Sequence, residues 1–357
     1  MGEIKVKGKP DKKRTLSVLK GEIPDRIPYF DVLIESKHVE KIIGKFCGDT
    51  LSRGEDEIAK GAIETIPMDP KDYINVCNYT GMDMILCEAM LAPFKKDVNG
   101  KTIIIRDKSI TCRKKLKEII PPSNTDIKER IEYIKDYKNA VKGTNIGVSV
   151  KVGALLSGIY NYVTGFENFM INVEDDINFI EELLDIGAEY FSKVVKGAVK
   201  LGVDYINAGN DLAYNSGLMM DINFFEKVWR KRYEKIIEPA LGNNIPVTFE
   251  SDGKIDEIVP MLIDMGFSLI CPMDSGAVDY KKYKKKYGNK IALGGGIDIR
   301  VLTNGSKEDV RNVVVEELKV LKPNGRYIFG SSHSITNSIP WENYVMMMNT
   351  FYEFCEY

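Results

Sequence analysis

The sequence predicts an α/β protein that folds as a single (β/α)8 TIM barrel. Seven times along the chain, a helix-like segment ends at a glycine and a short apolar segment of strand length begins within a few residues. Glycine accepts the left-handed conformation that closes a helix, so this alternation indicates a repeated unit of helix and strand. An earlier apolar segment, residues 27–30, brings the number of strands to eight, which favours a closed barrel over an open sheet. The seven glycines are Gly81, Gly143, Gly202, Gly242, Gly266, Gly288 and Gly325.

The seven later strands and two of the later helices can each be located from the local sequence. The strands that follow these glycines are expected at residues 82–87, 146–150, 203–206, 246–249, 268–271, 291–293 and 327–329. Two of the later helices show apolar stripes at helical spacing, which indicates faces that pack on the barrel. The stripes are Ile255, Ile258, Val259, Leu262 and Met265 in one helix and Val310, Val314, Leu318 and Leu321 in the other.

The remaining segments extend the barrel without adding a second domain, so residues 1–357 are expected to form one unit. Residues 1–25 are a lysine-rich arm with a short helix at 14–20. Two or three helices are expected between residues 31 and 80. The insertion at 92–125, after the second strand, contains alternating segments at 102–106 and 110–113. These segments predict a hairpin around Asp107 and Lys108, close to the barrel mouth.

The composition excludes several functional classes. Lys and Arg together number 50, and Asp and Glu number 52, so the chain lacks the basic excess that binds nucleic acids or anionic membranes. No run of about 18 apolar residues occurs, and the polar, lysine-rich start is unlike a secretory signal. The six cysteines form no CxxC pair, which suits a reducing compartment. These features predict a cytoplasmic protein that acts on a small molecule or on a specific protein partner.

The candidate active site lies where the barrel strands end. Loops at the carboxyl ends of barrel strands converge on one mouth, so residues far apart in sequence can share a pocket. Glu250 and Asp252 follow the fifth strand, two residues apart, and His333 follows the eighth. Two carboxylates that point the same way, together with one imidazole, form a three-ligand set for zinc or another divalent ion. Asp274, after the sixth strand, is a candidate fourth ligand.

Structural roles are the competing interpretation of the same residues. Asp252 before a helix is also a common N-cap, Glu250 can pair with a barrel lysine or arginine, and His333 can bond to loop backbone. The second histidine, His38, lies among charged residues and is expected on a helix surface in a structural role. Cys271 is expected to be a buried barrel cysteine rather than a ligand.

Other residues beyond strand ends are candidates for substrate binding. Asn207, Asn210 and Asp211 follow the fourth strand and can hydrogen-bond a substrate, although turn formation explains them about equally well. Tyr160 lies between glycines beyond the third strand. Its ring can form one side of a binding site for a planar ligand, or it can simply pack in the core. Asp298 follows a run of three glycines, a backbone that a ligand can approach closely.

Four segments of the sequence resemble the uroporphyrinogen decarboxylase superfamily. They are Asp25-Arg26-Ile27-Pro28, Phe249-Glu250-Ser251-Asp252-Gly253, Gly294-Gly295-Gly296-Ile297-Asp298, and His333 with Ile339-Pro340-Trp341-Glu342-Asn343. The resemblance spans nearly the whole chain and implies a (β/α)8 barrel. The superfamily contains the decarboxylase itself and the corrinoid-dependent methyltransferases, so the resemblance leaves two branches.

The decarboxylase branch implies a substrate with many carboxylates, an arginine-bearing segment after the first strand and an aspartate after the second. Here the first strand leads into Asp31 with no arginine as far as Glu35, and the second strand leads into Glu88. Acidic residues where cationic ones are needed argue against a polycarboxylate ligand. A metal-free decarboxylase is therefore the second-ranked interpretation, ahead of a non-catalytic ligand-binding barrel.

The methyltransferase branch implies a zinc site. Coenzyme M methyltransferases of this superfamily carry a His-x-Cys pair after the fifth strand and a later cysteine, and Glu250, Asp252 and His333 stand at these three places. Oxygen ligands are harder than thiolates and leave zinc a stronger Lewis acid, which favours a methyl donor that is an ether or resembles methanol. The resemblance thus implies O-demethylation, with transfer of the methyl group to Co(I) of a corrinoid protein. No Asp-x-His-x-x-Gly cobamide signature occurs in the chain, so the cobamide is expected on that partner.

Overall fold

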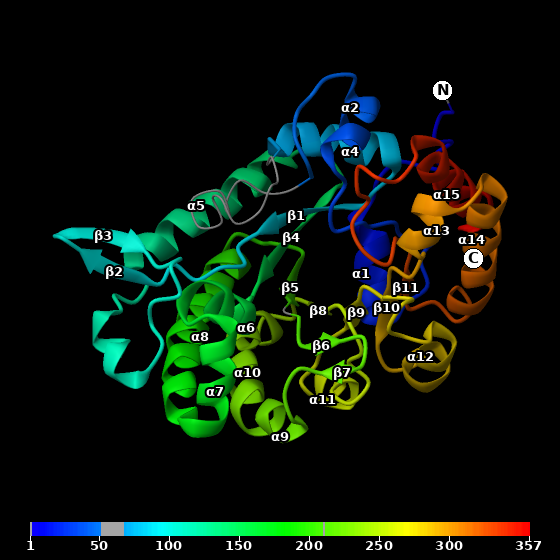
Figure 1. Ribbon diagram of the computed structural model, residues 1–357. Helices are drawn as coiled ribbons and strands as arrows, with labels where there is room; N and C mark the ends of the chain where they lie inside the picture. The colour runs from blue at the N-terminus through cyan, green and yellow to red at the C-terminus, as the bar shows by residue number, and fades with distance from the viewer. Residues whose placement is uncertain (1, 51–67, 210) are drawn as a thin grey trace.

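The core of the protein is a seven-stranded parallel sheet that curls into most of a barrel (Figure 1). The computed structural model describes residues 2–50, 68–209 and 211–357. The strands of the sheet lie side by side in chain order, and they confirm the seven predicted after the glycines, with bounds that differ by a few residues. They are β1 Met84–Glu88, β4 Gly147–Val152, β5 Tyr205–Gly209, β8 Val247–Glu250, β9 Leu269–Cys271, β10 Ala292–Gly294 and β11 Tyr327–Ile328.

Residues 28–30 close the barrel between the two edge strands, β11 and β1. Phe30 N donates to Phe329 O at 3.0 Å, and Phe329 N donates to Pro28 O at 2.9 Å. On the other side, Asp83 N donates to Tyr29 O at 3.4 Å. Pro28 has no N–H to donate, so this segment forms isolated bridges rather than a regular ladder. The predicted TIM barrel is confirmed, with its first strand the most irregular.

Helices surround the sheet on its outer side (Figure 1). The apolar stripes predicted at 255–265 and 310–321 are buried, although helix α11 begins only within the first of them. Among the described residues, no helix is long and apolar enough to cross a membrane. The α-helices are α1 Lys12–Lys20, α2 Ser36–Ile43, α4 Pro70–Thr80, α5 Asn124–Ala140, α6 Leu155–Gly158, α7 Phe166–Asp175, α8 Ile177–Lys200, α9 Ile222–Phe224, α10 Arg230–Leu241, α11 Val259–Asp264, α12 Tyr280–Tyr287, α13 Ile299–Asn304, α14 Lys307–Leu321 and α15 Trp341–Phe354. Shorter 3-10 or π-helical segments are η2 Arg113–Glu118, η3 Ile159–Val163 and η4 Phe225–Trp229.

Five of the seven marker glycines adopt the predicted left-handed conformation. Gly81, for example, ends α4 with a φ of 75° and donates its N–H to Cys77 O at 2.8 Å. Gly242 and Gly288 instead have a φ of −63° and remain right-handed. After Gly242 the positive φ moves to Asn244, at 57°, because asparagine also tolerates this conformation.

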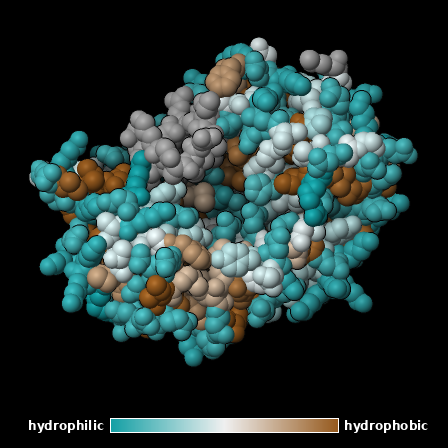
Figure 2. Space-filling model, in the orientation of Figure 1, coloured by the Kyte–Doolittle hydropathy of each residue, from teal (hydrophilic) through white to brown (hydrophobic). Residues whose placement is uncertain are grey.

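The insertion after β1 contains a hairpin, but not the one that the alternation predicted. Strands β2 Lys95–Val98 and β3 Lys101–Ile104 pair antiparallel around Asn99 and Gly100. These two residues have φ values of 55° and 79°, the geometry that an Asn-Gly dipeptide favours in a two-residue turn. The predicted pairing of 102–106 with 110–113 is therefore wrong, because the stronger turn signal lies earlier in the chain. The hairpin projects from the barrel, and its exposed apolar side chains form a brown patch at the left edge of Figure 2.

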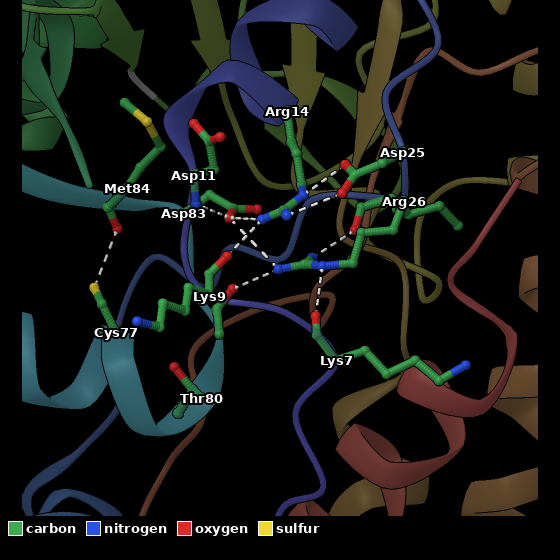
Figure 3. A network of polar contacts seen from close by, with 12 residues as sticks. Lys7, Lys9, Asp11, Arg14, Asp25, Arg26, Cys77, Thr80, Asp83 and Met84 are labelled. Atoms are coloured by element: carbon green, nitrogen blue, oxygen red, sulfur yellow. Dashed lines mark hydrogen bonds and ion pairs between the residues drawn. The ribbon is translucent and has the colours of Figure 1, made fainter. Parts of the chain in front are cut away.

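The N-terminal arm is tied to the amino ends of the strands by a buried network around Asp83 (Figure 3). Asp83 Oδ1 accepts hydrogen bonds from Asp11 N at 2.7 Å and from Arg14 Nη1 at 3.0 Å. Arg26 Nη2 lies 3.5 Å from the same oxygen, and Arg14 also pairs with the exposed Asp25. Apolar side chains of α1 pack into the cluster inside the barrel. The arm and α1 therefore close the bottom of the barrel and leave the opposite end open for a site.

Candidate active site

Two cavities meet at the carboxyl ends of the strands. The inner cavity, of about 70 Å³, lies within the barrel, and the outer cavity, of about 320 Å³, lies toward the ends of β1, β4 and β5. Glu250, Asp252 and His333 line both cavities. The structure therefore brings together the three residues that were predicted to form the active site, although they follow two different strands.

Glu250 ends β8 and is bound on both of its carboxylate oxygens. Lys151 Nζ, on β4, lies 2.5 Å from Glu250 Oε1, and Asn207 Nδ2, on β5, donates to Oε2 at 3.0 Å. Lys151 Nζ also lies 3.9 Å from Glu88 Oε1, on β1. Burial disfavours the Lys151 ammonium, but the charges of Glu250 and then Glu88 outweigh this effect and raise the pKa of Lys151. Glu250 thus has the barrel lysine as a partner, as its structural interpretation predicted.

Asp252 and His333 approach each other at the rim between the two cavities. His333 Nε2 lies 3.5 Å from Asp252 Oδ2, and both side chains are partly exposed. Burial, followed by the nearby charge of Asp211, raises the pKa of Asp252 to about 6. Helix α11 begins at Val259, so Asp252 is not its N-cap; Asp252 N instead donates to Asp211 Oδ1 at 3.3 Å. The rim therefore carries two neighbouring aspartates beside one imidazole.

The donor atoms at this rim fit zinc in part. Two atoms that each lie about 2.0–2.1 Å from a tetrahedral zinc ion are about 3.3–3.4 Å apart. This distance is close to the 3.5 Å between His333 Nε2 and Asp252 Oδ2. Glu250 fits less well, because both of its oxygens already accept hydrogen bonds. Among the described residues, no group of three or more His, Cys, Asp or Glu side chains is arranged to hold a metal ion, so the zinc set stays a prediction.

Two of the residues predicted to bind substrate line the cavities. Asn207 lines the inner cavity, where it also bonds Glu250, and Asp211 lines the outer cavity. Asn210, which lies between them in the sequence, is outside the described residues. The end of β5 is thus part of the candidate site.

Three other predicted residues are not among those that line either cavity. Tyr160 packs against the rings of Phe166 and Phe169, with centroids 5.3 and 5.8 Å away. Asp298 caps α13 and pairs with Arg300 at 2.6 Å. Asp274 Oδ1 accepts a hydrogen bond from the backbone N of residue 276 at 2.8 Å. Local contacts therefore account for all three side chains, and their roles toward a substrate or a metal stay predictions.

The structure corrects the expected position of His38. This histidine belongs to α2, but it is only 3% exposed and packs against the rings of Trp341 and Tyr344. Burial lowers its pKa to about 4, so the ring is neutral at pH 7. His38 is thus a core residue between two elements and not a residue of the helix surface.

Three polar residues at the mouth were not among the predicted site residues: Lys151, Thr248 and Asp31. Lys151 directly follows the expected strand at 146–150, so the rule that found Glu250 would also have found it. Thr248 lies inside β8 and carries no local signal. Asp31 is 2% exposed, lines the inner cavity and accepts hydrogen bonds from Tyr29 OH at 2.5 Å and Ser331 Oγ at 2.7 Å. Burial raises the pKa of the Asp31 carboxyl.

Comparison with known proteins agrees with this architecture. The fold is similar to that of a methyltransferase from Methanosarcina mazei, with a TM-score of 0.67 and 17% identity over 97% of this chain and 99% of that chain. A B12-independent methionine synthase from Shewanella sp. W3-18-1 overlays less well, with a TM-score of 0.42 and 16% identity over 62% of this chain and 63% of that chain. A β-(1,4)-mannanase from Podospora anserina has a TM-score of 0.43 and 12% identity over 99% of this chain and 66% of that chain. No curated protein matches the chain significantly. The sequence profile of the uroporphyrinogen decarboxylase (URO-D) family matches residues 10–354, so the chain belongs to that family.

Proposed function

We propose that this chain is a cytoplasmic methyltransferase that takes the methyl group of a methyl ether and passes it to Co(I) of a separate corrinoid protein. The residues that would hold a zinc ion are Asp252 and His333, with Glu250 and Asp274 as further ligands. Zinc bound there would supply a Lewis acid for the oxygen of the donor. The cobamide would arrive on the partner protein and accept the methyl group.

The observation that carries this proposal is the approach of Asp252 to His333 where the two cavities join. A donor whose oxygen lies at this junction has room on both sides. Its leaving group points into the inner cavity, and its methyl group faces the larger outer cavity. The aspartates at the rim, Asp211 and Asp252, favour a cation at this position, because their charges repel each other. The likeness to a solved methyltransferase and the membership of the URO-D family support the proposal.

The protein's own residues supply position and charge in this scheme. The ammonium of Lys151 donates to Glu250 and lies near Glu88, so these two carboxylates are partly neutralised by one buried cation. The charges of Asp211 and Asp252 lie close to each other at the rim, beside the imidazole of His333. A leaving group that fills the inner cavity would displace water from that side of the donor, which would strengthen electrostatic interactions at the rim.

The alternative, a metal-free decarboxylase, needs cationic side chains to bind a polycarboxylate. Of the described residues that line the two cavities, Lys151 is the only lysine or arginine, and it is already paired with Glu250. Because Lys151 is paired in this way, the decarboxylase function is less well supported than the methyltransferase function.

The proposal is tested by metal content together with methyl transfer. Zinc per chain is measured by mass spectrometry on protein purified without added metal or chelator. We expect near-stoichiometric zinc in the unmodified protein and loss of zinc in His333→Ala and Asp252→Asn. Transfer of methyl groups from methoxylated donors to Co(I) cobalamin should fall in parallel.

The matched control is Asp264→Asn. Asp264 is an exposed aspartate at the end of α11 that pairs with Arg230, outside both cavities. This variant should keep both zinc and activity. Full zinc and full methyl transfer in His333→Ala would contradict the scheme, and turnover of a porphyrinogen by metal-free protein would favour the decarboxylase.

A further inference from the structure

Two of the residues that line the inner cavity each carry a buried side-chain oxygen with no hydrogen-bond partner among the described residues. These atoms are Asn207 Oδ1 and Thr248 Oγ1, and each residue is only 1% exposed. Asn207 on β5 and Thr248 on β8 stand side by side in the register of the two strands. A buried oxygen without a partner is unfavourable, because it has lost its hydrogen bonds to water. A ligand that restores these bonds is therefore favoured at this place.

The rest of the inner cavity is mainly apolar. Its wall includes Tyr205, Leu269 and Ile328, which belong to the hydrophobic cluster that fills the barrel beneath it. At the end of β10, Gly294 and Gly295 line the cavity without contributing a side chain. The cavity thus combines a mainly apolar surface with two adjacent residues, Asn207 and Thr248, whose buried oxygens have no partner among the described residues.

The volume of the inner cavity limits what can enter it. A cavity of about 150 Å³ accepts benzene, whereas the inner cavity measures about 70 Å³. The inner cavity has less than half of that volume, so it favours a group of only a few non-hydrogen atoms over an aromatic ring. The outer cavity, at about 320 Å³, has no such limit.

We propose that the inner cavity binds a small aliphatic group that carries a hydroxyl, and that Asn207 and Thr248 select this group. Asn207 Oδ1 accepts the hydrogen bond of the hydroxyl, and Thr248 Oγ1 donates to its oxygen. The inference rests on the proposed function, in which this group is part of the leaving group of the methyl donor. The substrate class is then a small aliphatic methyl ether with a hydroxyl, and not a methoxylated aromatic whose ring enters the barrel.

The experiment measures binding of 2-methoxyethanol to the complete protein by ligand-observed NMR titration, with 2-methoxyphenol as the aromatic counterpart. Thr248→Val keeps the shape of the side chain and removes its hydroxyl. Thr15→Val is the matched control, because Thr15 Oγ1 is also buried without a hydrogen-bond partner in the described part of the chain, and Thr15 belongs to α1 and lines neither cavity. Neither substitution removes a hydrogen bond between described residues, so both variants should fold.

We expect Thr248→Val to weaken the binding of 2-methoxyethanol about five- to tenfold, the effect of one lost hydrogen bond, and Thr15→Val to leave it unchanged. Binding of 2-methoxyphenol should be weaker and should not depend on Thr248. Equal affinity in Thr248→Val, tighter binding of the aromatic probe, or no binding of either probe to the unmodified protein would overturn the proposal.

We call the proposed hydroxyl-binding place at Asn207 and Thr248 the subsite. An experiment can show that the subsite is wrong without showing that the proposed function is wrong, and the reverse. If Thr248→Val keeps zinc, methyl transfer and an unchanged KM for 2-methoxyethanol, the subsite is wrong and the function stands. If 2-methoxyethanol binds in a Thr248-dependent way but the protein neither holds zinc nor transfers methyl groups, the subsite stands and the function is wrong.

Discussion

Lys151 and Glu250 form an ion pair across an intervening strand. Lys151 lies on β4 and Glu250 on β8, with β5 between them, and Nζ and Oε1 are 2.5 Å apart. The two side chains are 8% and 14% exposed. Because the pair is buried, removal of one partner leaves an uncompensated charge. We expect Lys151→Met to lower the free energy of unfolding, measured by denaturant titration, by about 3–5 kcal/mol.

Two further variants test whether burial of the pair is the cause. Lys135 pairs with Glu132 at 2.8 Å on the surface of α5, with both side chains about half exposed. Lys135→Met should therefore lower the free energy of unfolding far less than Lys151→Met does, because solvent screens this surface pair. Adding Glu250→Gln to Lys151→Met should recover part of the lost stability. A loss in Lys151→Met as small as that of the surface control would show that the buried pair contributes little.

Glu317 makes the stability of the protein depend on pH. This residue of α14 is fully buried and accepts a hydrogen bond from Tyr327 OH at 2.8 Å. Burial raises its pKa from the ordinary 4.5 to about 8. Between these two values the folded chain binds a proton that the unfolded chain does not. The contribution of neutral Glu317 to stability is therefore fully present below about pH 4.5 and is lost as the pH rises through about 8.

We expect Glu317→Gln to remove this loss, because glutamine stays neutral. Denaturation midpoints measured from about pH 5 to about pH 8 should fall more steeply for the unmodified protein than for Glu317→Gln. Glu316→Gln is the control, since Glu316 is the exposed neighbour on the same helix. Parallel curves for the unmodified protein and Glu317→Gln would rule out a buried, neutral Glu317.

The network at the bottom of the barrel offers a comparison between two partners of one arginine. Arg14 pairs with Asp83, whose side chain is 0% exposed, and with Asp25, whose side chain is 65% exposed. We expect Asp83→Ala to lower the free energy of unfolding by about 3–5 kcal/mol, because Arg14 and Arg26 then lose a buried carboxylate. Asp25→Ala should cost about 1 kcal/mol or less. Equal losses in the two variants would mean that burial does not decide the contribution.

Alanine substitutions at two helix-ending glycines distinguish the cost of backbone strain from the cost of a side-chain clash. Gly81 and Gly143 have φ values of 75° and 80°, so alanine is strained at both positions. A Cβ on Gly81 would lie 2.0 Å from Tyr352 OH, whereas a Cβ on Gly143 would meet no atom of a described residue within 4 Å. We expect Gly143→Ala to cost about 1–2 kcal/mol in denaturant unfolding. Gly81→Ala should cost a further 1–3 kcal/mol or so, because Tyr352 must move; similar losses would contradict the clash.

Local patterns predicted much of the fold and part of the site. Glycine-ended helices and apolar strands repeat along the chain, and both depend on neighbours a few residues away. The same local rule placed Glu250, Asp252 and His333 after strand ends, where the two cavities now meet. The hairpin differs from the predicted one because the Asn99-Gly100 turn, also a local signal, pairs the segments on either side of it.

By itself the sequence determined the order of strands and helices and part of the set of residues at the mouth, because the βα repeat and its right-handed connections leave few arrangements. Only the tertiary structure decided how these side chains pair. Lys151 bonds Glu250, 99 positions away, and Asp298 turns to its neighbour Arg300 rather than to the mouth. Such pairings depend on distances of a few ångströms and on burial, which arise only when strands distant in sequence are brought side by side.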